Sequence, residues 1–378
     1  MNSLLKSKLL KFINFIATVN LVVYLVACLT PYIHPIHFSF LTFLAIGFPI
    51  LIVSICFWMV IYLFINAKKS VLFFVIMLAG FKNITNTFGL NVSAKNDNVK
   101  PVNAIRIISW NVRGFVAVVN NKNIYGGSFK GFINYIKKTN ADVVCLQDFD
   151  QDSLPNNTNS LQYIKDSLGY KNVYFSVDFN MPNKNGFYKY GTCIFSKFPI
   201  VQSNSIRYND GIHFNESLGF ADIIVNKKSI RIFTTHLKSM YTNILPTAKT
   251  TDFKYQIDDT NLVLHSTKLE KLQRFDISHI KQANIIKNVM DTTKIPFVFC
   301  ADLNAVPTSF VYSLISHNLN DAFLQNNFGW GSTYSSKIPF LRIDVILMSK
   351  QLKAINYKSP QLILSDHYPV IADIVLVE

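Results

Sequence analysis

The segment Ile295-Pro296-Phe297-Val298-Phe299-Cys300-Ala301-Asp302-Leu303-Asn304 is a near-continuous apolar run that ends in a carboxylate and a carboxamide. Such a run predicts a strand buried on both faces, as in a sheet covered by helices. Side chains two positions apart on a strand point the same way, so Asp302 and Asn304 can act together on one small target. An ordinary turn with Asx hydrogen bonds explains the same pair. The choice between these interpretations depends on the other strand ends of the chain.

Other apolar runs behind residue 104 also end in polar side chains. The pattern predicts strands over residues 105–110, 141–146, 190–196, 222–225, 229–235, 343–348 and 370–377, and helices over residues 129–138 and 272–290. The polar residues at or near the predicted strand ends are Asn111, Asp148, His236, Asp302, Asn304, Asp344, Asp366 and His367. Each has an ordinary explanation when taken alone, such as a helix cap or a buried histidine. Eight such coincidences together are improbable.

This set of residue types suits one kind of chemistry. Carboxylates, amides and imidazoles are the ligands and neighbours of hard divalent cations. The sequence offers no serine in a Gly-x-Ser-x-Gly setting as an alternative nucleophile. The set fits hydrolysis of a phosphate ester, in which a cation neutralises the non-bridging oxygens, a carboxylate orients water, and imidazole and amide donors stabilise the charged transition state.

The first 90 residues have a different composition and predict a membrane module. We expect spans over about residues 9–29, 38–65 and 71–90, because a bilayer core needs roughly 20 apolar residues. A signal peptide is the alternative for the first span, but a second apolar segment follows within ten residues and no small-residue cleavage site separates them. The third span contains Lys82 and is the least regular. A linker over residues 91–103 then leads to a domain over residues 104–378.

The charge of the chain is unevenly distributed. No Asp or Glu precedes Asp97, and only seven of the 37 Lys and Arg residues do, so 30 basic residues accompany all 22 acidic ones behind it, a net charge near +8. Such a surplus suits an anionic substrate or surface. The five cysteines show no zinc-binding spacing and no disulfide framework.

Six segments resemble, in the right order, the motifs of the endonuclease/exonuclease/phosphatase superfamily. They are Ile107-Ile108-Ser109-Trp110-Asn111-Val112, Val144-Cys145-Leu146-Gln147-Asp148, Thr234-Thr235-His236-Leu237, Ala301-Asp302-Leu303-Asn304, Arg342-Ile343-Asp344-Val345-Ile346 and Leu364-Ser365-Asp366-His367-Tyr368-Pro369-Val370. The superfamily includes pancreatic deoxyribonuclease, abasic-site endonucleases, inositol polyphosphate 5-phosphatases and neutral sphingomyelinases. The resemblance implies a four-layered α/β sandwich with two mixed β-sheets over residues 104–378, here in a membrane-anchored member of bacterial type.

The resemblance also implies a metal site. Asn111, Asp148 and Asp366 would lie at a Mg²⁺ ion, with Mn²⁺ as the alternative, and Asn111 would also help to position the phosphate. Asp148 stands where the family has a glutamate. It is one methylene shorter, so it reaches an ion at about 2.1 Å only if the backbone or the ion moves.

The remaining five residues carry catalytic roles in the same resemblance. Asp302 would orient or deprotonate the attacking water, and Asn304 and His236 would donate to phosphoryl oxygens. His367 would contact the scissile phosphate and be held by Asp344. The chain is therefore expected to be a metal-dependent hydrolase of phosphate ester bonds.

The sequence leaves three readings of the substrate. Tethering to a membrane favours lipid head groups or small phosphate esters, because it raises their effective concentration. The positive charge of the domain and an aromatic-rich stretch favour an endonuclease or exonuclease on DNA or RNA. The same aromatic residues also fit the core of strands. They are Tyr174, Phe175, Phe187, Tyr188 and Tyr190. The third reading is a non-catalytic membrane binding protein, against which the intact set of polar residues argues.

The distribution of lysines predicts the orientation of the module in a bacterial inner membrane. Lys6, Lys8 and Lys11 precede the first span, residues 30–37 contain no Lys or Arg, and Lys68 and Lys69 follow the second span. By the positive-inside rule the N-terminus and the second loop are cytoplasmic. The catalytic domain then lies outside the cytoplasm if the third segment crosses, which its eleven Val, Leu, Ile and Phe residues favour over the cost of one lysine.

Overall fold

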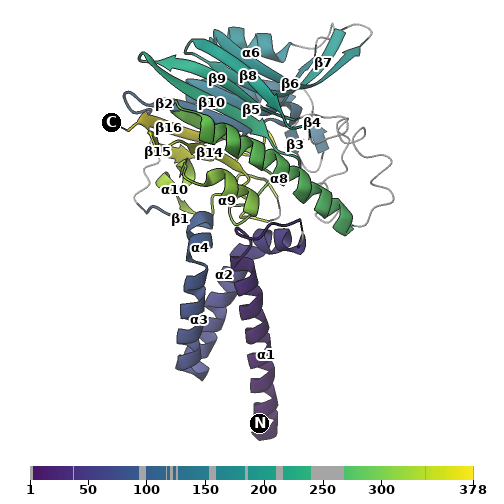
Figure 1. Cartoon of the computed structure of the whole chain (residues 1–378), viewed down its shortest axis with the longest axis vertical. Coiled ribbons are helices and arrows are strands. Elements are labelled where there is room, and N and C mark those ends of the chain that lie inside the picture. The colour runs from purple at the N-terminus through teal and green to yellow at the C-terminus, as the bar shows by residue number, and fades with distance from the viewer. Residues whose placement is uncertain are drawn as a thin grey trace.

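The computed structural model describes residues 3–36, 38–92, 99–115, 117–119, 122–124, 127–152, 159–183, 186–209, 216–239, 268–336 and 338–377. It consists of a helical module and an α/β sandwich at one end of that module (Figure 1). The N-terminus lies at the end of the module far from the sandwich. Residues 240–265, whose polar and irregular sequence predicts a long loop, fall outside the described residues.

The first β-sheet of the sandwich contains the apolar run that ends at Asp302. Its strand order is β12-β14-β11-β10-β9-β8. The buried strand β11 (Phe297–Asp302) pairs in parallel with β10 (Lys228–His236) and antiparallel with β14 (Asp344–Met348). The sheet is completed by β9 (Ser217–Val225), β8 (Ile200–Arg207) and β12 (Asn320–Asp321). It is therefore a mixed sheet, as predicted.

The second β-sheet is also mixed and has the order β15-β16-β2-β5-β7-β6. Its strands β2 (Ile105–Asn111) and β5 (Val143–Asp152) are parallel, and its other neighbouring pairs are antiparallel. The remaining strands are β15 (Leu352–Lys358), β16 (Val370–Leu376), β7 (Gly186–Ser196) and β6 (Asn172–Asn183).

Alternation along the strands assigns each face to a layer. On β11, Val298 and Cys300 enter the core between the two sheets, whereas Phe297 and Phe299 pack against helices on the outside. The outer face of the first sheet is covered by α8 (Lys268–Thr292) and α9 (Phe310–Ser316), and that of the second by α5 (Gly127–Thr139) and α6 (Ser160–Leu168). This is the expected four-layered α/β sandwich, and the fold prediction is confirmed.

Short elements fill the connections between the layers. They are η1 (Arg113–Phe115), β3 (Ala117–Val119), β4 (Lys122–Ile124) and α10 (Ala322–Asn326). The strand β8 was not predicted because its sequence is largely polar and most of it is exposed at the edge of the sheet. Edge strands lack the apolar run that marks a central strand.

Two helices of the module are long and apolar enough to cross a membrane. They are α1 (Ser3–Cys28) and α2 (Phe40–Ile65). The third predicted span is instead a pair of helices, α3 (Ala67–Ala79) and α4 (Phe81–Thr87), bent by 67° at Gly80. A side chain at Gly80 would meet the hydroxyl of Tyr24 at 2.2 Å, so only glycine fits at this bend. The pair counts as a third span if both helices together cross the bilayer.

The helical module is joined to the sandwich at several points. The chain leaves α4 directly into β1 (Gly89–Leu90), which pairs with β13 (Phe328–Gly329) of the sandwich. The hydroxyl of Thr42 at the start of α2 donates to the carboxylate of Asp276 on α8 over 2.9 Å. The two parts therefore share hydrogen bonds as well as a chain connection.

Arg342 forms the most deeply buried of the ionic contacts at this junction. Its guanidinium donates to Asp321 over 2.8 Å and to the carbonyl of Asn86 in α4 over 2.7 Å, and it lies 4.4 Å from the ring centre of Phe323. The side chain is 1% exposed. A buried guanidinium needs such partners, because each unpaired N–H would be costly.

We expect Arg342→Met to lower the free energy of unfolding by about 3–5 kcal/mol, because it leaves the buried carboxylate of Asp321 without its counterion. Denaturant titration of the full chain in detergent, followed by tryptophan fluorescence, measures this loss. Lys287→Met is the matched control: its partner Asp291 is exposed on α8, so its loss should change stability by less than about 1 kcal/mol. Equal losses in the two variants would contradict the buried role of Arg342.

Candidate functional site

Strand pairing brings three of the predicted site residues together on the first sheet. His236 at the end of β10 is the register partner of Asp302 at the end of β11, and Asp302 in turn faces Asp344 at the start of β14. The second sheet contributes Asn111 at the end of β2 and Asp148 within β5. All five residues are buried. Segments far apart in the sequence thus meet at one edge of the sandwich.

Asp302 lies at the centre of this arrangement. Its carboxylate has no exposed surface and accepts a hydrogen bond of 2.9 Å from the amide of Asn111. The ring nitrogens Nε2 of His236 and His367 lie 3.5 Å and 3.6 Å from Asp302 Oδ2. The backbone N–H of Asn304 donates to Asp302 Oδ1 over 2.9 Å. Asp302 and Asn304 thus lie in a turn in which the carboxylate of Asp302 fixes the backbone of Asn304.

A β-bulge places Asp148 in the site. The pairing of β5 with β7 is interrupted between Leu146 and Phe149, and Asp148 there has a φ of 50°. A bulge re-aims one side chain out of the normal alternation. Gln147 points into the core, where it donates to Thr234 over 3.0 Å, whereas Asp148 contacts His236 Nδ1 at 2.7 Å. A left-handed backbone at a residue other than glycine costs of order 1–3 kcal/mol and is concentrated at functional sites.

His236 is held between Asp148 and Asn304. Nε2 of the ring lies 2.9 Å from the amide nitrogen of Asn304, which also donates to the carbonyl of Leu237 over 3.0 Å. Because an amide nitrogen only donates, Nε2 accepts and Nδ1 carries the proton that faces Asp148. Asn304 itself has a φ of 47°, a second left-handed residue at the site. Its amide is thus held in place by His236 and by the carbonyl of Leu237.

His367 and Asp344 form a second pair. The ring nitrogen Nδ1 of His367 lies 3.0 Å from Asp344 Oδ2, and both residues are buried. Burial alone would lower the pKa of His367, but the charges of Asp344 and Asp302 outweigh it and raise the pKa to about 10. The backbone N–H of Asp344 donates to Thr333, and the ring of Tyr334 packs against His367 with centres 4.8 Å apart. The two carboxylates thus favour the protonated ring of His367.

Asp366 lies at the edge of this network. The described contacts connect it to Arg113, whose Nε is 3.6 Å from Asp366 Oδ2, and to Ser365 over 3.3 Å. Ser365 in turn donates to the backbone carbonyl of Asn111 over 2.9 Å. Seven of the eight predicted residues thus form one contact network, and the eighth joins it through its neighbours.

The donor set suits a divalent cation. One carboxylate oxygen each of Asp302 and Asp344 lie within 4.8 Å of one another, and Asp148 adds another buried carboxylate. Burying several carboxylates together is unfavourable unless positive charge accompanies them. Hard oxygen ligands in this number are typical of Mg²⁺ and Mn²⁺ sites.

Three contacts of the site were not predicted. The hydroxyl of Tyr190 on β7 donates to Asp148 Oδ1, Arg113 pairs with Asp366, and Tyr334 covers His367. Arg113 lies two residues after Asn111, and this closeness in sequence indicates that its side chain can reach the site. Tyr190 belongs to the aromatic-rich stretch, but nothing in the sequence connects Tyr190 or Tyr334 with the site.

The aromatic-rich stretch lies on strands, as one of its two interpretations expects. Tyr174 and Phe175 are on β6, and Phe187, Tyr188 and Tyr190 are on β7. Phe175 packs against Phe149, with ring centres 5.2 Å apart. Because β6 and β7 pair antiparallel, the five residues belong to a sheet and not to loops.

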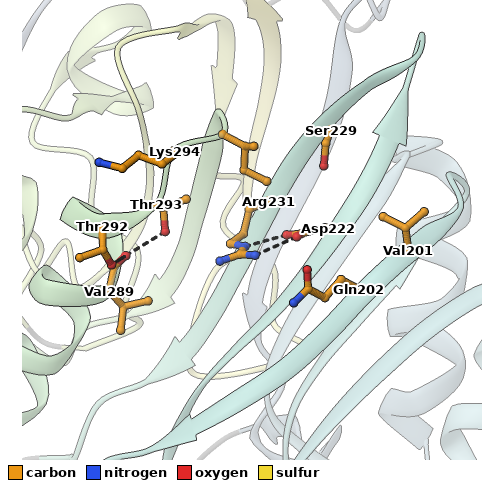
Figure 2. Close-up of a pocket in the computed structure, with 10 residues that line it drawn as sticks. Val201, Gln202, Asp222, Ser229, Arg231, Val289, Thr292, Thr293 and Lys294 are labelled. Carbon is orange, nitrogen blue, oxygen red and sulfur yellow. Dashed lines mark hydrogen bonds and ion pairs between the residues drawn. The ribbon is translucent and has the colours of Figure 1, made fainter.

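A cavity of about 420 Å³ lies at the other end of the first sheet (Figure 2). It is lined by the starts of β10 and β11 and the end of α8, away from the predicted site residues. Within it, Arg231 donates to Asp222 over 2.6 Å and 2.8 Å, so this ion pair is satisfied internally. The cavity therefore presents little free chemistry to a ligand.

Comparison of the sandwich with solved structures shows the same fold. An endonuclease/exonuclease/phosphatase from Beutenbergia cavernae superposes with a TM-score of 0.53 at 16% identity, over 72% of each chain. The human Nocturnin catalytic domain with bound sulfate anion superposes with a TM-score of 0.50 at 19% identity, over 74% of this chain and 97% of that one.

A relative with a named activity is more similar in sequence. The chain is 27% identical over 208 residues to a DNA-(apurinic or apyrimidinic site) endonuclease of Dictyostelium discoideum. The match covers 54% of this chain and 43% of that protein, so the chain spans less than half the length of this relative.

Family models match both parts of the chain. Residues 7–87 match a domain of unknown function. Residues 108–367, well over half of the chain, match the endonuclease/exonuclease/phosphatase family model. The chain belongs to the endonuclease/exonuclease/phosphatase superfamily.

Proposed function

We propose that this protein is a membrane-anchored phosphoesterase that depends on a divalent metal ion. Members of its superfamily are hydrolases that act on phosphate esters and generally use divalent metal ions. The observation that carries the proposal is the buried carboxylate of Asp302 within reach of Asn111, His236 and His367. That arrangement supplies a base and several donors around one point.

The residues that would hold the ion are Asn111, Asp148 and Asp366. A bound Mg²⁺, or Mn²⁺ in its place, would neutralise phosphate oxygens and so lower the barrier to attack. Asp148 is shorter than the family glutamate, and its contacts with Tyr190 and His236 fix it on the bulge of β5. The bulge is the local backbone change through which a shorter side chain can still reach the site.

The side chains around Asp302 divide the work of hydrolysis. Asp302, oriented by Asn111, takes the proton of the attacking water. The Asn304 amide would donate to a phosphoryl oxygen, whose charge increases in the transition state, in place of its contact with His236. His236 positions this amide and Asp148. His367, held by Asp344, contributes a positive charge at the scissile phosphate. The substrate enters an edge of the sandwich where donors are already in position.

Lipid head groups or small phosphate esters are the proposed substrates. Val306, two residues beyond Asn304, packs in one cluster with Ala45 in the second turn of α2. The site therefore lies close to the end of a helix long enough to span a membrane, which supports access to phosphates at a membrane surface. An endonuclease or exonuclease activity is the alternative, supported by the relative from Dictyostelium and by the positive charge of the domain.

We further propose that the sandwich lies outside the cytoplasm. The start of α2 contacts the sandwich through Thr42, whereas Lys69 beyond its other end donates to Asn14 of α1 over 2.6 Å. The lysines that the positive-inside rule places in the cytoplasm are thus at the end of the module away from the sandwich.

We expect the full chain in nanodiscs to hydrolyse at least one member of a panel of sphingomyelin, phosphoinositides, bis-p-nitrophenyl phosphate and supercoiled plasmid when Mg²⁺ or Mn²⁺ is present. Asp302→Asn should lower turnover by at least about a hundredfold, the usual scale for a positioned acid or base. Excess EDTA should abolish activity. Asp222→Asn, whose residue lies at the far cavity, is the control for loss of a buried carboxylate. Full turnover by Asp302→Asn, or in EDTA, would sink the assignment.

We expect His367 and Asp344 to act as one unit, because the carboxylate holds the ring that contacts the phosphate. His367→Ala and Asp344→Ala should each lower turnover strongly, and the double variant should be little worse than the worse single one. The measurement is log turnover for the four members of the cycle. Additive losses would instead mean that the two residues act separately.

We expect protease added to intact spheroplasts to remove the sandwich and leave the helical module in the membrane. The reason is that α3 and α4 together would form the third crossing. Immunoblotting with tags at both ends follows the two parts. Protection of the sandwich until the membrane is permeabilised would show two crossings and a cytoplasmic domain.

A further inference from the structure

Pro49 lies inside α2 and changes the hydrogen bonding of the helix at a defined place. In an α-helix the N–H of residue 49 would donate to the carbonyl of residue 45, but proline has no N–H. The carbonyl of Ala45 is therefore released from the helix ladder. The hydroxyl of Thr308, from the sandwich, donates to this carbonyl over 2.8 Å. Ala45 and Thr308 are 2% and 1% exposed, so water does not replace this contact.

Thr308 is held from its other side as well. The hydroxyl of Thr30, between α1 and α2, lies 2.7 Å from the backbone carbonyl of Thr308 and 2.8 Å from that of Ala27, so the two acceptors share its one proton. The residue thus gives one hydrogen bond to the helical module and receives one from it. A freed backbone carbonyl in an apolar span needs such a partner, because no water is available to it.

The segment fixed in this way belongs to the site. Thr308 follows Asn304 by four residues, and between them Val306 packs in one cluster with Ala45 and with Leu341 and Ile343, which precede Asp344. The N–H of Leu303 donates to the carbonyl of Ile343 over 2.8 Å. The loop over residues 303–308 is therefore also joined to the loop that ends at Asp344. The left-handed backbone of Asn304 persists only where surrounding structure holds it.

We infer that Pro49 and Thr308 are positioning residues: the carbonyl that Pro49 frees anchors the loop behind Asn304, so that the helical module holds this loop in its catalytic geometry. The inference rests on the proposed function for its effect on rate, but its structural part is independent of it. The helical module is then a working part of the enzyme as well as its anchor.

The experiment uses the full chain in nanodiscs and four variants of this contact. Thr308→Val removes the donor at constant shape, and Thr308→Ser keeps it. Pro49→Ala supplies an N–H that competes for the carbonyl of Ala45, and the double variant P49A/T308V closes the cycle. Val53→Ala, on an exposed face of α2, is the control for altering the helix. The readouts are hydrogen–deuterium exchange of residues 303–308 and 343–344, and kcat and KM for bis-p-nitrophenyl phosphate.

Thr308→Val and Pro49→Ala should each lower kcat by about threefold to tenfold with little change in KM, the scale of one hydrogen bond. Both variants should speed hydrogen–deuterium exchange in the two loops. The kcat of the double variant should be no lower than that of the worse single variant. Thr308→Ser and Val53→Ala should behave as the unchanged chain. Unchanged exchange in Thr308→Val and Pro49→Ala, equal losses in Thr308→Ser and Thr308→Val, or additive losses would overturn the inference. If the unchanged chain hydrolyses no phosphate ester, the proposed function fails, and exchange alone decides whether the contact holds the loops.

Discussion

A carboxylate without exposed surface is the constraint on which the rest of this structure depends. Asp302 can be buried only if donors surround it, because an unpaired charge in the interior is very costly. Those donors come from both sheets: the amide of Asn111 from one, and the backbone N–H of Asn304 from the other. The two sheets must therefore meet with their strand ends in register. Within the first sheet, the pairing of β10, β11 and β14 places His236, Asp302 and Asp344 side by side.

The central strands and most of the site could be predicted from the sequence. An apolar run bounded by polar residues predicts a strand buried on both faces, and a short stretch of sequence is enough to recognise it. It led to β2, β5, β10, β11 and β14, and six ordered motifs led to the superfamily. The side chains that these strands position at their ends followed from the same reasoning, because the carboxyl ends of neighbouring parallel strands meet at one edge.

The remaining features depend on contacts between distant segments, which no local pattern encodes. The hydroxyl of Tyr190 reaches Asp148 only because β7 pairs with β5 around a bulge, and a bulge leaves no mark in the run of apolar residues. The aromatics of β6 and β7 allowed two interpretations, strand core or base stacking, because the pairing of the two strands is not visible in either run alone. The proline inside the second apolar span likewise gives no sign of its partner: Thr308 lies more than 250 positions from the carbonyl of Ala45.

The short pairing of β1 with β13 limits how far the sandwich can move relative to the helices. A domain on a flexible tether sweeps a volume set by the length of its linker, and its effective concentration falls as that volume grows. Here the chain enters the sandwich within two residues of α4, and Phe88 packs against both Phe328 and Trp330 at that point. The edge that carries the candidate site is consequently held at one height above the helices. It changes place only when the helical module moves with it.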